Sequence, residues 1–167
     1  MDKLPTTPGS VVSFVVQPED YLTDPQPYDE PQTSVATLIP GSISSTGEIE
    51  SAVWASAYID DPEDKGNVYS EEFILARDPQ LLVETFPASE RPDLVEMVNE
   101  SGIAAVGAVI HVNQYEGEPE STFVFAPGFI HDGELGDCMF TNSYGGFHVS
   151  DVFESDPILL YVPDKLI

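Results

Sequence analysis

Apolar runs rich in β-branched residues recur along the chain between short polar turns, and this pattern favours strands over helices. The two longest runs are residues 103–112 and 122–130. Gly117 and Pro119 lie between them and break any regular ladder. We therefore expect a β-hairpin in which residues 116–120 form a five-residue loop.

The length of this loop fixes which residues of the two strands face each other. His111 would lie opposite Phe125, and Gly107 would lie opposite Phe129 and leave room for its ring. Both faces of the hairpin are apolar in this register. The hairpin should therefore lie in the middle of a sheet and be covered on both sides.

Shorter apolar segments predict the remaining strands. These segments are residues 10–16, 33–39, 49–59, 138–141, 147–149 and 158–162. The Pro40-Gly41 pair should end the second of them. Residues 17–32 combine four prolines with five acids, so we expect an irregular, acidic, Pro-rich surface loop there.

Capping residues predict up to three short helices in the middle of the chain. Ser70 can cap a first helix, Asp78 a second over residues 79–85, and Ser89 a third over residues 89–101. The third is the best defined, because a glycine follows it directly. The elements together predict an α+β fold, a mostly antiparallel β-sheet with two or three short helices.

The length of the chain is typical of one domain. Its 167 residues include 41% hydrophobic and 10% aromatic residues. A chain of this size can bury roughly two-thirds of the surface that it exposes when unfolded. We therefore expect residues 1–167 to form a single compact domain.

Acidic residues dominate the charge of the chain. Thirty Asp and Glu residues stand against five Lys and Arg residues, which gives a formal net charge of −25 at pH 7. Thirteen acids lie from Pro92 to Asp164, with no Lys or Arg among them. Carboxylates at this density repel one another unless salt or a basic partner screens them. They would also repel nucleic acid and anionic lipid, so we expect no direct binding of nucleic acid or membranes.

The sequence favours a cytoplasmic location. The N-terminal residues lack the basic and apolar segments of a signal peptide, and no apolar run reaches the ~20 residues of a membrane span. The single cysteine, Cys138, excludes an intramolecular disulfide.

One acidic turn partly matches a calcium-binding loop. Asp61, Glu63, Gly66 and Glu72 occupy positions that such a loop uses, but Lys65 takes the place of a ligand oxygen. We therefore interpret this turn as a solvated acidic turn.

The residue types of a zinc site are also present. They are His111, His131, Cys138 and His148, but their spacings match no zinc motif. The expected hairpin register places His131 opposite Ala105, which separates it from His111 by ~20 Å along the sheet. We therefore expect no metal and no other cofactor.

A cysteine-dependent reaction is the other enzymatic alternative. Cys138 could act as a nucleophile with His131 or His148 as its base and Asp132 or Asp137 as the orienting acid. A thiolate is favoured by positive charge, whereas these acids should raise the pKa of the thiol. Among thirty acids, a pair suited to glycoside hydrolysis carries no information. A small metal- or cysteine-dependent hydrolase is therefore the least favoured function.

The charge itself is the main functional signal. A surface of carboxylates can imitate a nucleic acid and occupy the Lys/Arg groove of a nuclease or defence effector. Tyrosines beside the acids would anchor such an interface. These candidate binding residues are Asp60, Asp61, Glu63, Asp64, Asp93, Glu96, Glu100, Tyr115, Glu116, Glu118, Glu120, Asp132, Glu134 and Asp137.

The sequence therefore predicts a non-enzymatic inhibitor of a basic nucleic-acid-processing protein, such as a phage anti-defence protein or an immunity protein for a toxin. The first alternative is a structural or assembly component, for example of a phage particle, whose acidity keeps it soluble. Adaptation to high salt fits less well, because halophilic surfaces keep more arginines than the two found here.

Overall fold

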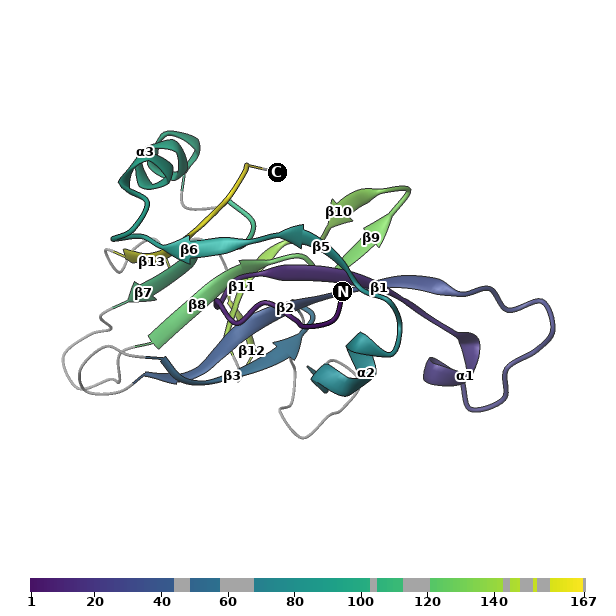
Figure 1. Cartoon of the computed structure of the whole chain (residues 1–167). Helices are drawn as coiled ribbons and strands as arrows, with labels where there is room; N and C mark the ends of the chain where they lie inside the picture. Colours follow the sequence, from purple (N-terminus) through teal and green to yellow (C-terminus); the bar gives the residue numbers. More distant parts are fainter. Residues whose placement is uncertain are drawn as a thin grey trace.

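The structure is a computed structural model that describes residues 1–43, 49–57, 68–102, 105–112, 121–142, 145–147, 152 and 157–166. Within these residues, strands of antiparallel sheets make up most of the regular structure, and three short helices surround them (Figure 1). The mostly antiparallel architecture is as predicted, although strands dominate it more than the class α+β implies.

The first sheet has five strands in the order β4-β3-β2-β1-β5. They are β1 (Val11–Val16), β2 (Gln32–Ile43), β3 (Ile49–Ala55), β4 (Val68–Tyr69) and β5 (Gln80–Val83). The prediction that Pro40-Gly41 end β2 is wrong. The ladder between β2 and β3 continues past them with a shift in register, which is how a strand accommodates a proline.

The second sheet has six strands in the order β12-β11-β8-β7-β13-β6. They are β6 (Thr85–Pro87), β7 (Val109–Val112), β8 (Ser121–Ala126), β11 (Met139–Asn142), β12 (Gly145–Phe147) and β13 (Ile158–Pro163). A separate hairpin consists of β9 (Phe129–His131) and β10 (Glu134–Gly136). Only Glu84 lies between β5 and β6, so one stretch of chain passes from the first sheet into the second.

The two sheets pack against each other through shared apolar clusters. One cluster joins Val11, Val35 and Val83 of the first sheet to Phe123, Phe125 and Phe140 of the second. Another joins Ile39 and Ala55 to Val109, Val124 and Ala126. Successive residues of β8 therefore enter different clusters, and all of them from Phe123 to Ala126 are buried. The central, doubly covered position predicted for this strand is confirmed.

The predicted register between these two strands is wrong. His111 pairs with Thr122, three residues from the expected Phe125, and Val112 pairs with Ser121. A shift by an odd number of residues moves every side chain of one strand to the other face of the sheet. The first strand also begins only at Val109, because a backbone turn precedes it, in which the Ala108 amide donates to the Ala105 carbonyl over 2.9 Å.

The expected partners of Phe129 and His131 are likewise wrong. His131 pairs with Glu134 rather than Ala105, because residues 129–136 close into their own hairpin. The Phe129 ring lies over Gly136, where an added Cβ would come within 2.6 Å of the ring. The glycine that makes room for this ring is thus Gly136 and not Gly107.

Gly107 instead forms a joint with Gly9, at which the turn before β1 meets the turn before β7. Both residues have positive φ angles, 92° for Gly9 and 87° for Gly107. A Cβ on Gly9 would lie 2.2 Å from the Gly107 carbonyl oxygen. Beside them the Thr85 hydroxyl donates to the Pro8 carbonyl over 2.8 Å. Backbone therefore packs directly on backbone where the sheets meet.

The helices are α1 (Pro18–Tyr21), α2 (Glu71–Leu75) and α3 (Pro92–Ser101). α2 begins as predicted, since Ser70 Oγ accepts a hydrogen bond from the Phe73 amide over 3.2 Å. Its Ile74 packs on the first sheet among the residues of a third apolar cluster. No helix in the described part of the chain is both long and apolar enough to cross a membrane.

Two helix predictions need correction. Residues 80–83 form strand β5 and not a helix, because Leu81 pairs with Val12 of β1 and Asp78 lies in a left-handed turn with φ 46°. Tertiary pairing outweighs the local capping signal here. α3 begins after Arg91 rather than Ser89, and it ends at Gly102 as predicted.

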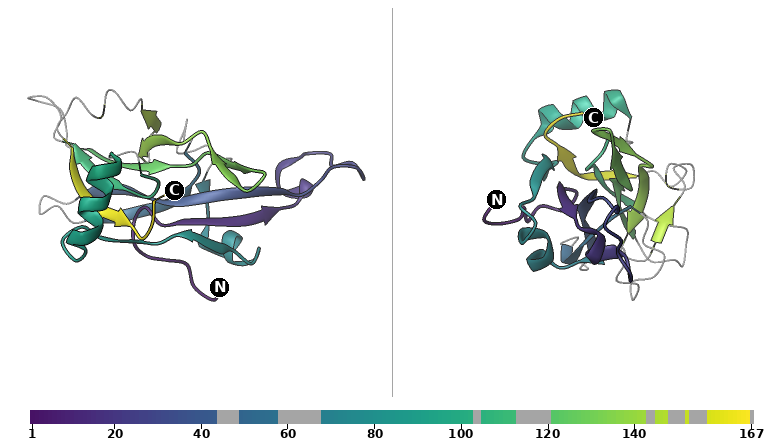
Figure 2. Two further views of the ribbon diagram at one scale, coloured as in Figure 1. Left: turned by 90° about the horizontal axis from the view of Figure 1, so that it is seen from above. Right: turned by 90° about the vertical axis from the view of Figure 1, so that its right-hand side faces the viewer.

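The molecule is elongated, and its two ends differ. Figures 1 and 2 show α3 at one end of the body and α1 at the other. At the α1 end, β1 and β2 run beyond the second sheet and carry the loop between them outward. The β9–β10 hairpin lies towards this same end, alongside β2.

Candidate protein-binding surfaces

The structure separates the candidate acids that it describes into two groups. Asp93, Glu96 and Glu100 lie on α3, whereas Asp132, Glu134 and Asp137 lie on the β9–β10 hairpin and the residue that follows it. The two groups lie at different ends of the molecule (Figure 2). The candidates Asp60, Asp61, Glu63 and Asp64, and Tyr115, Glu116, Glu118 and Glu120, lie outside the described residues.

On α3 the acids share the helix with a buried apolar face. Leu94 and Val98 pack towards β13, which leaves Glu96 and Glu100 exposed on the outside. The carboxylate of Asp93 accepts two hydrogen bonds from the Arg91 guanidinium, at 3.0 and 2.8 Å. This pairing lowers the pKa of Asp93 and raises that of Arg91. One acid of the group is thus already neutralised within the chain.

The β9–β10 hairpin closes with a tight two-residue turn that contains Asp132. His131 pairs with Glu134, and the turn residues Asp132 and Gly133 have φ angles of 49° and 81°. Positive φ at both positions is what a type I′ turn requires, and Asp-Gly is a favoured sequence for it. The Asp132 side chain is almost fully exposed, and Glu134 and Asp137 are exposed as well. The hairpin therefore exposes Asp132 at its turn and Glu134 at the start of β10, and the exposed Asp137 follows the end of β10 away from the turn.

The loop between β1 and β2 forms a third acidic surface. It contains α1, and its backbone is fixed by side chains of its own. The Tyr21 hydroxyl donates to the Glu30 carbonyl over 2.8 Å, and the backbone amide of Gln26 donates to the Asp29 carboxylate over 2.6 Å. Residues 19–28 are all exposed, but the loop is not irregular throughout, because Pro18–Tyr21 form α1.

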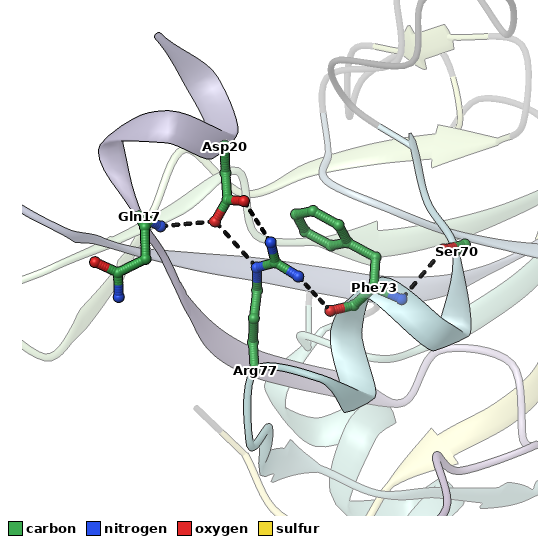
Figure 3. A network of polar contacts seen from close by, with 5 residues as sticks. All are labelled: Gln17, Asp20, Ser70, Phe73 and Arg77. Carbon is green, nitrogen blue, oxygen red and sulfur yellow. Dashed lines mark hydrogen bonds and ion pairs between the residues drawn. The ribbon is translucent and has the colours of Figure 1, made fainter. Parts of the chain in front are cut away.

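Arg77 ties this loop to α2 across the molecule. Its guanidinium forms an ion pair with the carboxylate of Asp20, 57 residues away, and donates to the Phe73 carbonyl over 2.9 Å (Figure 3). The guanidinium also lies 3.4 Å from the centre of the Phe73 ring. The hydrogen bond from Arg77, followed by that from the Gln17 amide, lowers the pKa of Asp20. Arg77 thus holds the acidic loop at its base.

Replacing Arg77 by methionine is expected to lower the free energy of unfolding by about 1–2 kcal/mol, because a long-range ion pair and its hydrogen bonds are lost. The folded-state pKa of Asp20 is lowered from 3.8, so its stabilisation is complete above pH 3.8 and is lost as the pH falls through the lowered value. Urea unfolding at pH 7 and at pH 3 measures both effects, and the difference between the variant and the parent should shrink at pH 3.

The matched control is Arg91→Met, which removes the other arginine–aspartate pair. Arg91 and Asp93 are two residues apart and partly open to solvent, so this change should leave the unfolding midpoint within error of the parent. Equal losses for the two variants would show that the pair between Arg77 and Asp20 does not hold the loop.

The residues considered for metal or thiol chemistry do not converge in the described part of the chain. No group of three or more His, Cys, Asp and Glu side chains there is placed to hold a metal ion. His111 lies in β7 with its ring 3.5 Å from the Thr122 hydroxyl, whereas His131 lies at an exposed turn. Burial raises the pKa of the Cys138 thiol, and the charge of Asp137 raises it further. The thiol is therefore kept protonated and poorly nucleophilic.

The sequence predicts the acidic loop and points to Tyr21 and Tyr28 beside its acids, but these residues are not in the set of candidate binding residues. The signal was present, because tyrosines and carboxylates alternate with prolines between residues 17 and 32. What the sequence could not show is that β1 and β2 carry this loop beyond the second sheet and that Arg77 anchors it. Comparison of the chain with protein-family models, curated proteins and solved structures gave no match.

Proposed function

We propose that the protein is a non-enzymatic inhibitor that binds a basic nucleic-acid-processing protein and occupies the groove in which that protein holds DNA or RNA. The observation that carries the proposal is the unbalanced charge of a folded body. The net charge is −25, and the two arginines of the chain are each engaged by an aspartate. The exposed carboxylates that do not belong to these two ion pairs can bind the cationic side chains of a partner.

The β9–β10 hairpin is the best-placed described surface for this role. Its turn is narrow, Asp132 and Glu134 stand on backbone that strand pairing closes, and Asp137 follows directly after β10. Carboxylates on a rigid support can replace phosphates in a basic groove without first having to be ordered. A phage anti-defence protein or a toxin-immunity protein would have this form, and both act by blocking a nuclease or a related effector.

The test uses charge neutralisation at one end of the molecule. In the triple variant Asp132→Asn, Glu134→Gln and Asp137→Asn, asparagine tolerates the positive φ angles of 49° and 48° at the two aspartates, so the backbone should be kept. Nuclease activity of a host-cell extract is measured with the parent protein and with the variant. The parent should abolish one activity, and the variant should need roughly 10- to 100-fold more protein for the same effect.

The control is the triple variant Asp93→Asn, Glu96→Gln and Glu100→Gln on α3, which removes the same charge from the other end of the molecule. Inhibition by the parent should also weaken as salt is raised, because the contacts are between charges. If the parent inhibits no nuclease and forms large particles in light scattering, the proposal is wrong and the assembly role replaces it. If both triple variants weakened inhibition equally, the hairpin would not be a specific binding site, and the effect would come from non-specific attraction between the acidic protein and its basic partner.

A further inference from the structure

The strands β1 and β2 expose one face of their ladder where they run beyond the second sheet. Val11, Ser13 and Val15 point to the same face of β1, since side chains alternate along a strand. Val11 is 0% and Ser13 8% exposed, but Val15 is 43% exposed. Its cross-strand partner Thr33 is exposed too. The face of β1 that carries the buried Val11 therefore continues past the second sheet, where Val15 is exposed.

The loop at the tip of this overhang exposes further apolar surface. Tyr21 and Leu22 are 40% and 37% exposed, and Tyr28 is 79% exposed. Four of the ten exposed large hydrophobic residues in the described part of the chain thus lie within residues 15–28. We call residues 15–33 the projecting segment. Large exposed apolar side chains concentrated on one element are typical of a protein-binding surface.

The projecting segment is also held in place. Tyr21, Asp29 and Arg77 fix it through hydrogen bonds and the ion pair to Asp20, whereas Tyr28 makes no hydrogen bond or ring contact within the described residues. A rigid support with one free tyrosine costs little conformational entropy on binding. Tyrosine is also among the residues that contribute most to binding energy at interfaces.

The charge of the segment identifies the kind of partner. It carries five acids and no Lys or Arg, and Arg77, which contacts it from beyond α2, is already paired with Asp20. A second copy of the chain would bring another charge of −25 to the contact, which disfavours self-association. A basic surface is the complementary one.

We propose that the projecting segment docks on the basic partner protein, with Tyr28 inserted into an apolar recess that Lys and Arg side chains surround. This inference rests on the proposed function and adds a contact at the same end of the molecule as the β9–β10 hairpin. The two elements would then bind the partner at two separate points. The hairpin would contact it through carboxylates, and the projecting segment through the Tyr28 ring.

The experiment replaces Tyr28 with the photo-crosslinking residue benzoylphenylalanine and irradiates the protein in an unfractionated host-cell extract. The matched control carries the same residue in place of Met97, which is 42% exposed on α3 at the other end. We expect one discrete adduct with a basic nucleic-acid-binding protein from position 28 and none from position 97. With that protein purified, Tyr28→Ala should weaken binding about 10- to 100-fold and leave the melting temperature unchanged.

Three outcomes would overturn the inference and leave the proposed function standing, provided that the parent still inhibits its target. They are an adduct with a second copy of the chain, an adduct with an acidic or neutral protein, and unchanged affinity of Tyr28→Ala. If the parent neither inhibits a nuclease nor yields an adduct with a basic protein, both proposals fail together.

Discussion

Replacing Gly9 by alanine is expected to lower the free energy of unfolding by about 3 kcal/mol or more. An alanine Cβ at this position would lie 2.2 Å from the Gly107 carbonyl oxygen and 2.8 Å from a methyl group of Val109. Because the first of these atoms belongs to the backbone, it cannot move aside without displacing the turn before β7. The φ angle of 92° adds a further cost for any residue that has a Cβ.

Gly133→Ala is the control that separates these two costs. Gly133 has a similar φ angle of 81°, but nothing lies within 4 Å of its missing Cβ. The free energy of unfolding of this variant should fall by only about 1 kcal/mol, because the positive φ angle is unfavourable for alanine but no atom clashes with its Cβ. Chemical unfolding of both variants measures the difference. If Gly9→Ala were no less stable than Gly133→Ala, the two turns could not be in contact as the structure places them.

Replacing Phe123 by alanine is expected to lower the free energy of unfolding by about 3–5 kcal/mol. The side chain is 1% exposed and lies in the apolar cluster that joins the two sheets. Its ring meets that of Phe147 edge to face, with 4.7 Å between the ring centres. Alanine would leave a cavity between strands that neighbouring residues hold in register, so the surroundings can collapse only in part.

Phe129→Ala removes the same side chain from an exposed position. Phe129 is 41% exposed and its ring rests on Gly136, so its loss should cost less than about 1 kcal/mol. Denaturant titration followed by circular dichroism gives both values with one protocol. Similar losses for the two variants would contradict the assignment of β8 to the interior.

The strands that were predicted correctly are those whose local signal and tertiary role agree. β1 follows the turn at Pro8-Gly9, and β13 is a continuous apolar run near the end of the chain. The cap of α2 is similar, because Ser70 satisfies a free amide within the same turn. In these cases residues close together in the sequence determine the local structure, so the element can be predicted from the sequence alone.

The register of β7 against β8 could not be predicted, because it depends on contacts between distant residues. The sequence predicts a five-residue loop between the two strands, but eight residues separate the paired Val112 and Ser121. Where β7 can begin is decided by Gly107, which contacts Gly9 almost 100 residues away. Both faces of the hairpin are apolar, so the alternation of polar and apolar residues that normally indicates the register is absent.

The sequence identifies which candidate residues are acidic but not how they are arranged in space. Composition identified acidity as the main feature, and the acids of α3 and of the β9–β10 hairpin are exposed as expected. Their separation into two ends depends on the packing of the sheets, which no local signal reports. The same holds for Arg77, whose partner Asp20 lies in another element.

The joint between Gly9 and Gly107 also bears on how such a protein can change during evolution. Neither position can accept a side chain, so both should remain glycine in any descendant that keeps the fold. Exposed carboxylates outside turns and ion pairs, such as those of Glu96 and Glu100, hold no such structural duty and can be gained, lost or exchanged between Asp and Glu. A lineage of this protein could therefore redistribute its surface acids while the two glycines keep the scaffold the same.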